Sequence, residues 1–179
     1  GIAVRDGIAQ QLAAGVHTCG KALASAGAFV CGSAALKEHL INHARTFAFS
    51  TAMPPYISEQ VRAPLVLARG MDRERQELMS KARRLADGLR ADGRYTGRSE
   101  TQIVPLIIGE NEHALSAAEH LQSQGFAVRA VRPPTVPPGS ARLRFSLTCG
   151  ISDDELLRLE NSLNIWREKN HSSTAVARA

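Results

Sequence analysis

A single lysine, Lys21, lies among residues too small to cover it and is the first candidate for covalent chemistry. Thr18 precedes it by three positions, and the stretch 17–28 contains no acid that would pair with it. Lysine is seldom buried without a partner. A poorly solvated amine with no counter-ion loses its proton readily, as Schiff-base formation with a carbonyl requires. The alternative interpretation is an exposed lysine on a flexible glycine–alanine loop.

A proline-rich loop and the segment after it form the second candidate site. Four prolines between positions 133 and 138 stiffen the loop, which limits the entropy lost when a ligand binds. On the strand expected at 142–147, alternation places Arg142 and Arg144 on one face. Two guanidinium groups on one face can clamp a carboxylate. The alternative is an edge strand with a basic side facing solvent.

Two hydroxyl residues, Ser50 and Thr51, precede a helix that Pro54 and Pro55 are expected to start. A helix N-terminus with nearby hydroxyls can bind a phosphate. Ordinary N-capping is the commoner explanation for such residues. Histidine pairs elsewhere lack a third ligand at suitable spacing, so no metal site is predicted.

The composition excludes several functional classes. The net charge is +5, but the 22 Lys and Arg are interspersed with 17 Asp and Glu, and aromatic residues make up 4% of the chain. This pattern is typical of solvated helix faces and argues against nucleic-acid binding. We find no apolar run that would span a membrane and no signal-peptide pattern. Three widely spaced cysteines favour reduced thiols, so a cytoplasmic protein is expected.

The elements that must position these residues suggest two domains in an α/β chain. Residues 1–68 are interpreted as part of a larger α/β layer. Its expected elements are a helical segment at 1–15, extended segments at 16–18, 27–31 (a buried strand) and 45–50, and helices at 33–43 and 56–68. Pro64 predicts a kink or a break in the last helix.

Residues 69–170 are predicted to form a compact α+β domain, with helices on a mainly antiparallel three-stranded sheet. Its expected elements are helices at 72–91, 112–124 and 152–169, and strands at 102–108, 126–131 and 142–147. Ser152 and Glu155 have the spacing of a capping box. The remaining residues, 171–179, are predicted to be a disordered tail.

Taken together and in this order, the candidate segments resemble the α-oxoamine synthases, pyridoxal-phosphate enzymes of the aspartate-aminotransferase fold. The resemblance covers roughly residues 14–165, and the proline loop is its most specific part. It is carried by the segments His17–Lys21, Phe49–Pro55, Arg132–Pro137 and Ala141–Arg144. It implies part of a PLP-binding large domain, followed by a small α+β C-terminal domain.

The resemblance implies roles for residues of the segments His17–Lys21 and Phe49–Pro55. Lys21 would hold pyridoxal 5′-phosphate (PLP) covalently and then remove the α-proton of the amino acid. Thr18 would bind the cofactor phosphate. Ser50 and Thr51 would reach the phosphate of the neighbouring subunit's cofactor, which implies a homodimer with the active site at its interface.

In the proline loop and the strand after it, the resemblance implies that Thr135 lines the substrate pocket and that Arg144, in preference to Arg142, takes the amino-acid carboxylate. The implied reaction is the decarboxylative condensation of L-alanine with a pimeloyl thioester of CoA or of a carrier protein, in biotin biosynthesis. Condensation of glycine with acetyl-CoA or succinyl-CoA is the alternative within the family.

One departure from the family concerns the pyridinium nitrogen of the cofactor. The family carries an Asp-x-x-His motif before the lysine. In residues 1–20 the only aspartate is Asp6, and the position three residues later holds Ala9 in place of a histidine. The chain therefore resembles the C-terminal half of such an enzyme. We expect it to be inactive by itself, and a non-catalytic fragment is the second hypothesis.

Overall fold

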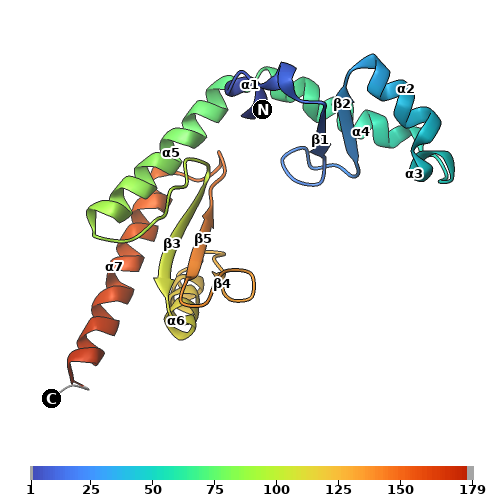
Figure 1. Cartoon of the computed structure of the whole chain (residues 1–179). Coiled ribbons are helices and arrows are strands. Elements are labelled where there is room, and N and C mark those ends of the chain that lie inside the picture. Colours follow the sequence, from blue (N-terminus) through green and yellow to red (C-terminus); the bar gives the residue numbers. More distant parts are fainter. Residues whose placement is uncertain (1, 177–179) are drawn as a thin grey trace. The chain divides into compact units, whose positions relative to one another are not determined.

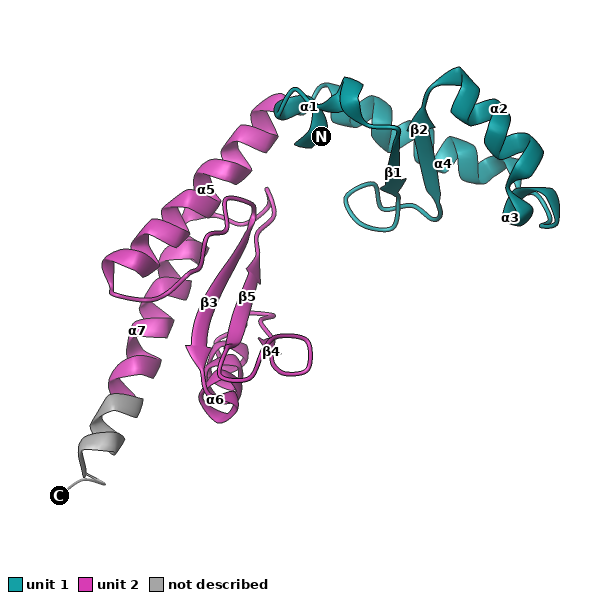
Figure 2. Cartoon of the chain, in the orientation of Figure 1, with its two compact units in different colours: residues 1–71 teal, residues 72–179 magenta. Residues whose placement is uncertain are grey.

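The computed structural model describes the backbone of residues 2–176 and the side chains of residues 2–169. The chain divides into two compact units, residues 1–71 (unit 1) and residues 72–179 (unit 2), as Figure 2 shows. No helix among the described residues has the length and apolar character needed to cross a membrane.

Unit 1 contains a two-stranded antiparallel hairpin. Strand β1 (Ala14–Thr18) pairs with β2 (Ala28–Gly32), and Thr18 lies opposite Ala28. The other elements of the unit, all visible in Figure 1, are α1 (Ile2–Arg5), a 3₁₀ turn (Ala9–Gln11), α2 (Ala34–His43), α3 (Arg45–Ala48) and α4 (Pro55–Arg69).

Local signals start two of these helices as predicted. The hydroxyl of Ser33 accepts a hydrogen bond from the backbone N–H of Leu36 at 3.1 Å, which caps α2. Pro55 occupies the first turn of α4, where its missing N–H costs nothing.

The structure revises the expectations for residues 45–50 and for Pro64. The segment expected to be extended at 45–50 begins with α3, because the Phe49 N–H donates to the Arg45 carbonyl at 3.0 Å and closes a helical turn. Of the kink or break expected at Pro64, the break is absent, since α4 continues through this residue. Pro64 leaves the carbonyl of Gln60 without its helical donor, and at this exposed residue water can supply one.

Unit 1 has almost no core of its own. Among its described residues only Cys19 is buried, with 0% of its surface exposed, whereas Val16 and Phe49 are 68% and 83% exposed. Strand β2, expected to be buried, is likewise mostly exposed, because no described element of the unit covers it fully. Apolar surface left in water contributes little to stability, so this unit gains little from burial.

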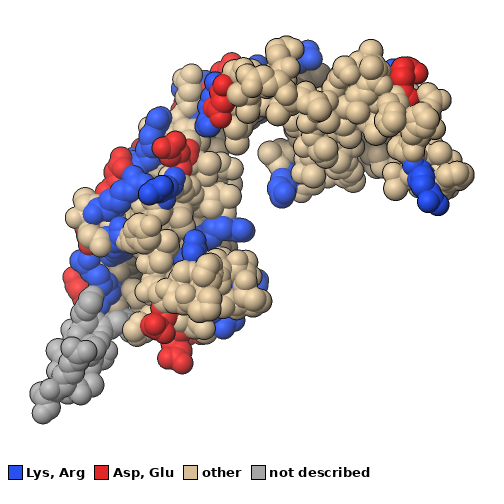
Figure 3. Space-filling view, in the orientation of Figure 1, with Lys and Arg blue, Asp and Glu red and all other residues tan. Residues whose placement is uncertain are grey.

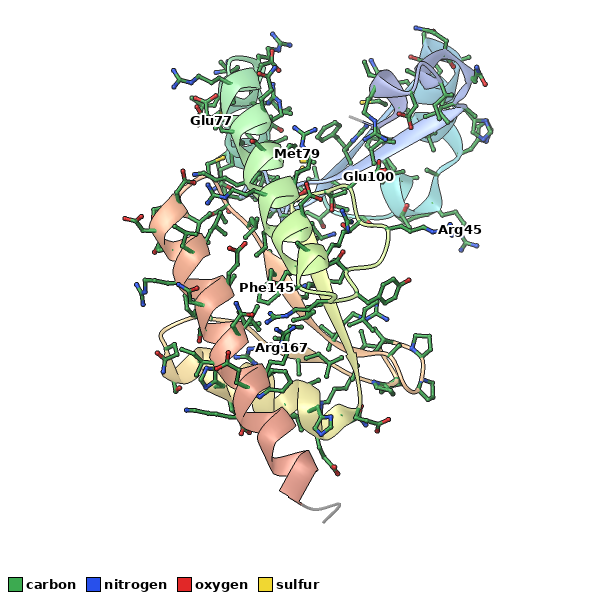
Figure 4. All side chains as sticks on the ribbon, turned by 90° about the vertical axis from the view of Figure 1, so that its left-hand side faces the viewer. Arg45, Glu77, Met79, Glu100, Phe145 and Arg167 are labelled. Carbon is green, nitrogen blue, oxygen red and sulfur yellow. The ribbon has the colours of Figure 1, made fainter. Side chains whose placement is uncertain are left out.

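Unit 2 packs helices on one face of an antiparallel sheet. Its elements are α5 (Asp72–Ala91), β3 (Ile103–Gly109), α6 (Asn111–Ser123), β4 (Ala130–Val131), β5 (Ala141–Ser146) and α7 (Asp153–Val176), and the sheet order is β3–β5–β4. Leu143 and Phe145 of β5 join the core with Leu85, Leu121 and Leu163 of the three helices. Figure 4 shows Phe145 in this layer. The predicted small domain, helices on a three-stranded antiparallel sheet, is confirmed.

The ends of helix α7 combine a confirmed and a revised prediction. The Glu155 N–H donates to the Ser152 hydroxyl at 3.1 Å, and the Ser152 N–H donates to Glu155 Oε2 at 2.7 Å, so the capping box forms. At its other end α7 continues to Val176, beyond its expected end at 169. The last three residues of the predicted tail, 177–179, lie outside the described residues.

Opposite charges alternate on the helical side of unit 2, where Figure 3 shows Lys and Arg interleaved with Asp and Glu. On α5 they form ion pairs one helical turn apart, such as Arg73 with Glu77 at 2.8 Å and Arg90 with Asp87 at 3.1 Å. This arrangement is the solvated helix face that the sequence predicts.

Candidate functional site

Lys21 lies in the turn that joins β1 to β2, formed by residues 19–27 (the lysine turn). Three backbone hydrogen bonds hold this turn: Cys19 N–H to the Gly27 carbonyl at 2.9 Å, Ser25 N–H to the Cys19 carbonyl at 3.0 Å, and Ala24 N–H to the Lys21 carbonyl at 2.9 Å. Gly27 and Ala24 both have positive φ, +79° and +46°. Ala24 is strained there, as residues at functional sites often are.

The Lys21 side chain is exposed and forms no ion pair with a described residue. The expectation of a poorly solvated lysine is therefore wrong for unit 1, because its alanine and glycine neighbours are too small to shield it. The amine is accessible to an aldehyde from solution.

Two hydroxyl groups accompany the lysine. Thr18 ends β1 three residues before it and is exposed. Ser25 belongs to the turn itself, and its buried Oγ has no hydrogen-bond partner among the described residues. Buried hydroxyls are normally satisfied, so this one can still take a polar partner. The sequence reasoning did not single out Ser25.

The predicted phosphate segment lies between α3 and α4. Met53, near its end, lines an apolar pocket of about 240 Å³ together with Cys19 of the lysine turn. Ser50 and Thr51 are both exposed, and α4 has no side-chain cap. Ordinary N-capping of α4, the alternative explanation for these hydroxyls, is therefore wrong.

In unit 2, the two predicted substrate residues line one pocket of about 820 Å³. Thr135 comes from the proline-rich loop and Arg144 from β5. Arg142 is not part of the pocket, because its guanidinium donates to the carbonyl and hydroxyl of Ser140 at 3.0 and 3.1 Å. Strand β5 lies between β3 and β4, so the alternative of an edge strand is wrong.

The same pocket contains two cations that sequence reasoning missed, Arg129 and Arg132. The sequence predicts a continuous strand over 126–131, but only Ala130 and Val131 pair with β5. The pocket lies where the pairing stops. The sequence signal that could have identified them is the number of arginines on both sides of the proline loop.

Lys21 belongs to unit 1, whereas Arg144 belongs to unit 2. The structure places Thr18 at the end of β1 and Lys21 in the turn that follows it, and it places Thr135 and Arg144 in the lining of one pocket. That the two groups act on one substrate stays a prediction.

Comparisons with known proteins place the chain in a family. The profile of the aminotransferase class I and II family matches residues 2–163. A putative 8-amino-7-oxononanoate synthase from Paramagnetospirillum magneticum is 43% identical over 159 residues, which cover 89% of this chain and 40% of the relative. The chain spans between 36% and 40% of the length of the first three curated relatives that it matches.

Solved structures share the fold. A serine palmitoyltransferase from S. paucimobilis with bound PLP–myriocin superposes with a TM-score of 0.83 at 22% identity, covering 94% of this chain and 43% of that one. An 8-amino-7-oxononanoate synthase from Francisella tularensis gives 0.74 at 24% identity, covering 88% and 46%. At these identities the likeness shows the fold, and it confirms the predicted fold class.

Proposed function

Because the chain belongs to the aminotransferase class I and II family, we propose that it is the lysine- and arginine-bearing part of a PLP-dependent acyltransferase, of the 8-amino-7-oxononanoate synthase type. Similarity to relatives of that name over most of the chain supports this. The observation that carries the proposal is Lys21 itself. Its amine is exposed and forms no ion pair with a described residue. Three backbone hydrogen bonds hold the turn that carries it.

The residues of the lysine turn fit part of a PLP molecule. Lys21 Nζ would hold the aldehyde carbon, and the Thr18 hydroxyl would donate to the phosphate. The Ser25 hydroxyl, which has no hydrogen-bond partner among the described residues, is a further polar group in the turn that could form a hydrogen bond with a ligand. When bound, PLP supplies an electron sink for the α-carbon of the amino acid.

The pyridinium nitrogen lacks an obvious partner in the described residues of unit 1. Asp6 is the one aspartate upstream of Lys21, and its carboxylate accepts a hydrogen bond from Arg5 Nε at 2.8 Å. That bond holds the pKa of Asp6 below its usual value. This observation favours the second candidate function, a fragment without catalysis of its own.

In the reaction we propose, Arg144 orients L-alanine by its carboxylate and Lys21 Nζ takes the proton from its α-carbon. A carbon–carbon bond forms between that carbon and the thioester carbonyl, and the carbon–sulfur bond breaks. The bond from the α-carbon to the carboxylate then breaks and carbon dioxide leaves. Lys21 returns its proton to the α-carbon, and the thiolate takes one from solvent. Thr135 would line the pocket.

A homodimer and a cytoplasmic location are part of the same proposal. Ser50 and Thr51 are exposed and cap no helix, so their hydroxyls remain available to the phosphate of a cofactor in a neighbouring subunit.

Reductive labelling tests this proposal directly. The protein is incubated with PLP, reduced with borohydride and digested, and the modified peptide is mapped. We expect the label on Lys21, and its loss in Lys21→Ala. Lys37→Ala is the matched control, since Lys37 is also exposed but lies on α2. Labelling spread equally over Lys21 and Lys37 would refute a specific site and favour the non-catalytic fragment.

A further inference from the structure

The pocket of unit 2 carries more positive charge than one carboxylate needs. Arg129, Arg132 and Arg144 all line it, and no acidic residue does. None of these three guanidinium groups forms an ion pair with a described residue. Arginine stays charged under all ordinary conditions, so the pocket lining carries three positive charges and no negative one. Such a pocket suits a ligand with at least two anionic groups.

Strand register explains how two of these arginines come to face one space. Ala130 pairs with Leu143 and Val131 with Arg142, so a continued ladder would place Arg129 directly opposite Arg144. Residues directly opposite in an antiparallel pair share one face of the sheet, and like charges there repel. The ladder ends at Ala130, and the pocket opens between Phe126–Arg129 and the far end of β5.

The lining between these charges is apolar. Phe126, Val128, Leu147 and Ile151 contribute to it. A volume of about 820 Å³ accommodates a medium-sized ligand. A hydrocarbon chain that carries a charge at its end matches this lining better than a phosphate, which has no apolar part.

We propose that Arg129 binds the terminal carboxylate of a dicarboxylic acyl chain, while Arg144 takes the amino-acid carboxylate. This assignment rests on the proposed acyltransferase function and adds to it the residue that would select the acyl donor. Acyl groups that end in a carboxylate, such as pimeloyl, are then favoured over acyl groups of the same length that end in a methyl group. Arg129 acts in specificity and takes no part in proton transfer.

Direct binding to the chain tests this without PLP and without turnover. The dissociation constants of pimelate and heptanoate, which have equal length and differ by one carboxylate, are measured by calorimetric titration. We expect pimelate to bind about tenfold more tightly, because a charge-assisted contact is worth one to two powers of ten. Arg129→Gln should remove this preference and leave heptanoate binding unchanged, whereas Arg129→Lys should keep part of it.

Arg83→Gln is the matched control, since Arg83 is an exposed arginine on α5 that does not line the pocket, and it should keep the full preference. Circular dichroism of each variant establishes that unit 2 is folded. Equal affinities for pimelate and heptanoate, or a preference that survives Arg129→Gln, would overturn the proposal. So would inorganic pyrophosphate that binds through Arg129 more tightly than pimelate, because the site would then be a phosphate site. An unlabelled Lys21 with intact pimelate selectivity would refute the proposed function alone.

Discussion

Truncating one core residue of β5 tests the account of how the arginine pocket is held. Leu143 is 0% exposed and precedes Arg144 on the central strand of the sheet. Leu143→Ala removes buried methyl groups and leaves a cavity, a change that costs about 3–5 kcal/mol in packed cores. For a unit of this size, 1 kcal/mol shifts the Tm by roughly 4–8 °C, so we expect a Tm lower by at least about 12 °C.

The assay is thermal unfolding followed by far-ultraviolet circular dichroism, with urea unfolding for the free-energy change. Leu157→Ala is the control, because this leucine on α7 is 53% exposed and should cost less than about 0.5 kcal/mol. Equal losses in both variants, or a loss below about 1 kcal/mol in Leu143→Ala, would refute the assignment of Leu143 to a tightly packed core.

Two further predictions concern local contacts of unit 2. Ser152→Ala should lower stability by about 1 kcal/mol through loss of the α7 cap. The hydrogen bonds from Ser152 hold the pKa of Glu155 below its usual value. The ionised Glu155 therefore stabilises the fold at pH values above the pKa that it has in the unfolded chain. This contribution is lost as the pH falls through the lowered pKa of the folded state. The difference between wild type and Ser152→Ala should accordingly shrink in acid, and a constant difference down to pH 2 in urea titrations would contradict it. In heptanoate titrations, Arg144→Gln should weaken binding about tenfold. Arg142→Gln should weaken it less than twofold, because Arg142 already donates to Ser140. Equal losses of affinity in the two variants would contradict the choice of Arg144.

The predictions that succeeded depend on neighbours in sequence. Ser33 caps α2, and Ser152 with Glu155 caps α7, because a cap involves residues three positions apart. The alternation that puts Arg142 and Arg144 on the same face of β5 is equally local. For these features, both partners of the contact lie within a few residues of each other, so the local sequence is enough to predict them.

The predictions that failed depend on contacts or surroundings that local sequence does not contain. Whether Phe126–Arg129 pairs with β5 is decided across the sheet, and alternation within the segment predicts only that it is extended. The exposure of Lys21 depends on what covers the lysine turn, which its own small residues do not reveal. The roles of Arg129 and Arg132 were missed for the same reason, since only the folded unit brings them beside Arg144.

Among the described residues, unit 1 has one buried residue and unit 2 has a full core, and this contrast has a consequence for the chemistry. A segment with few buried contacts opens locally at little free-energy cost. The shape of the lysine turn, and with it the position of the Lys21 amine, therefore relies on the three backbone hydrogen bonds within the turn more than on packing.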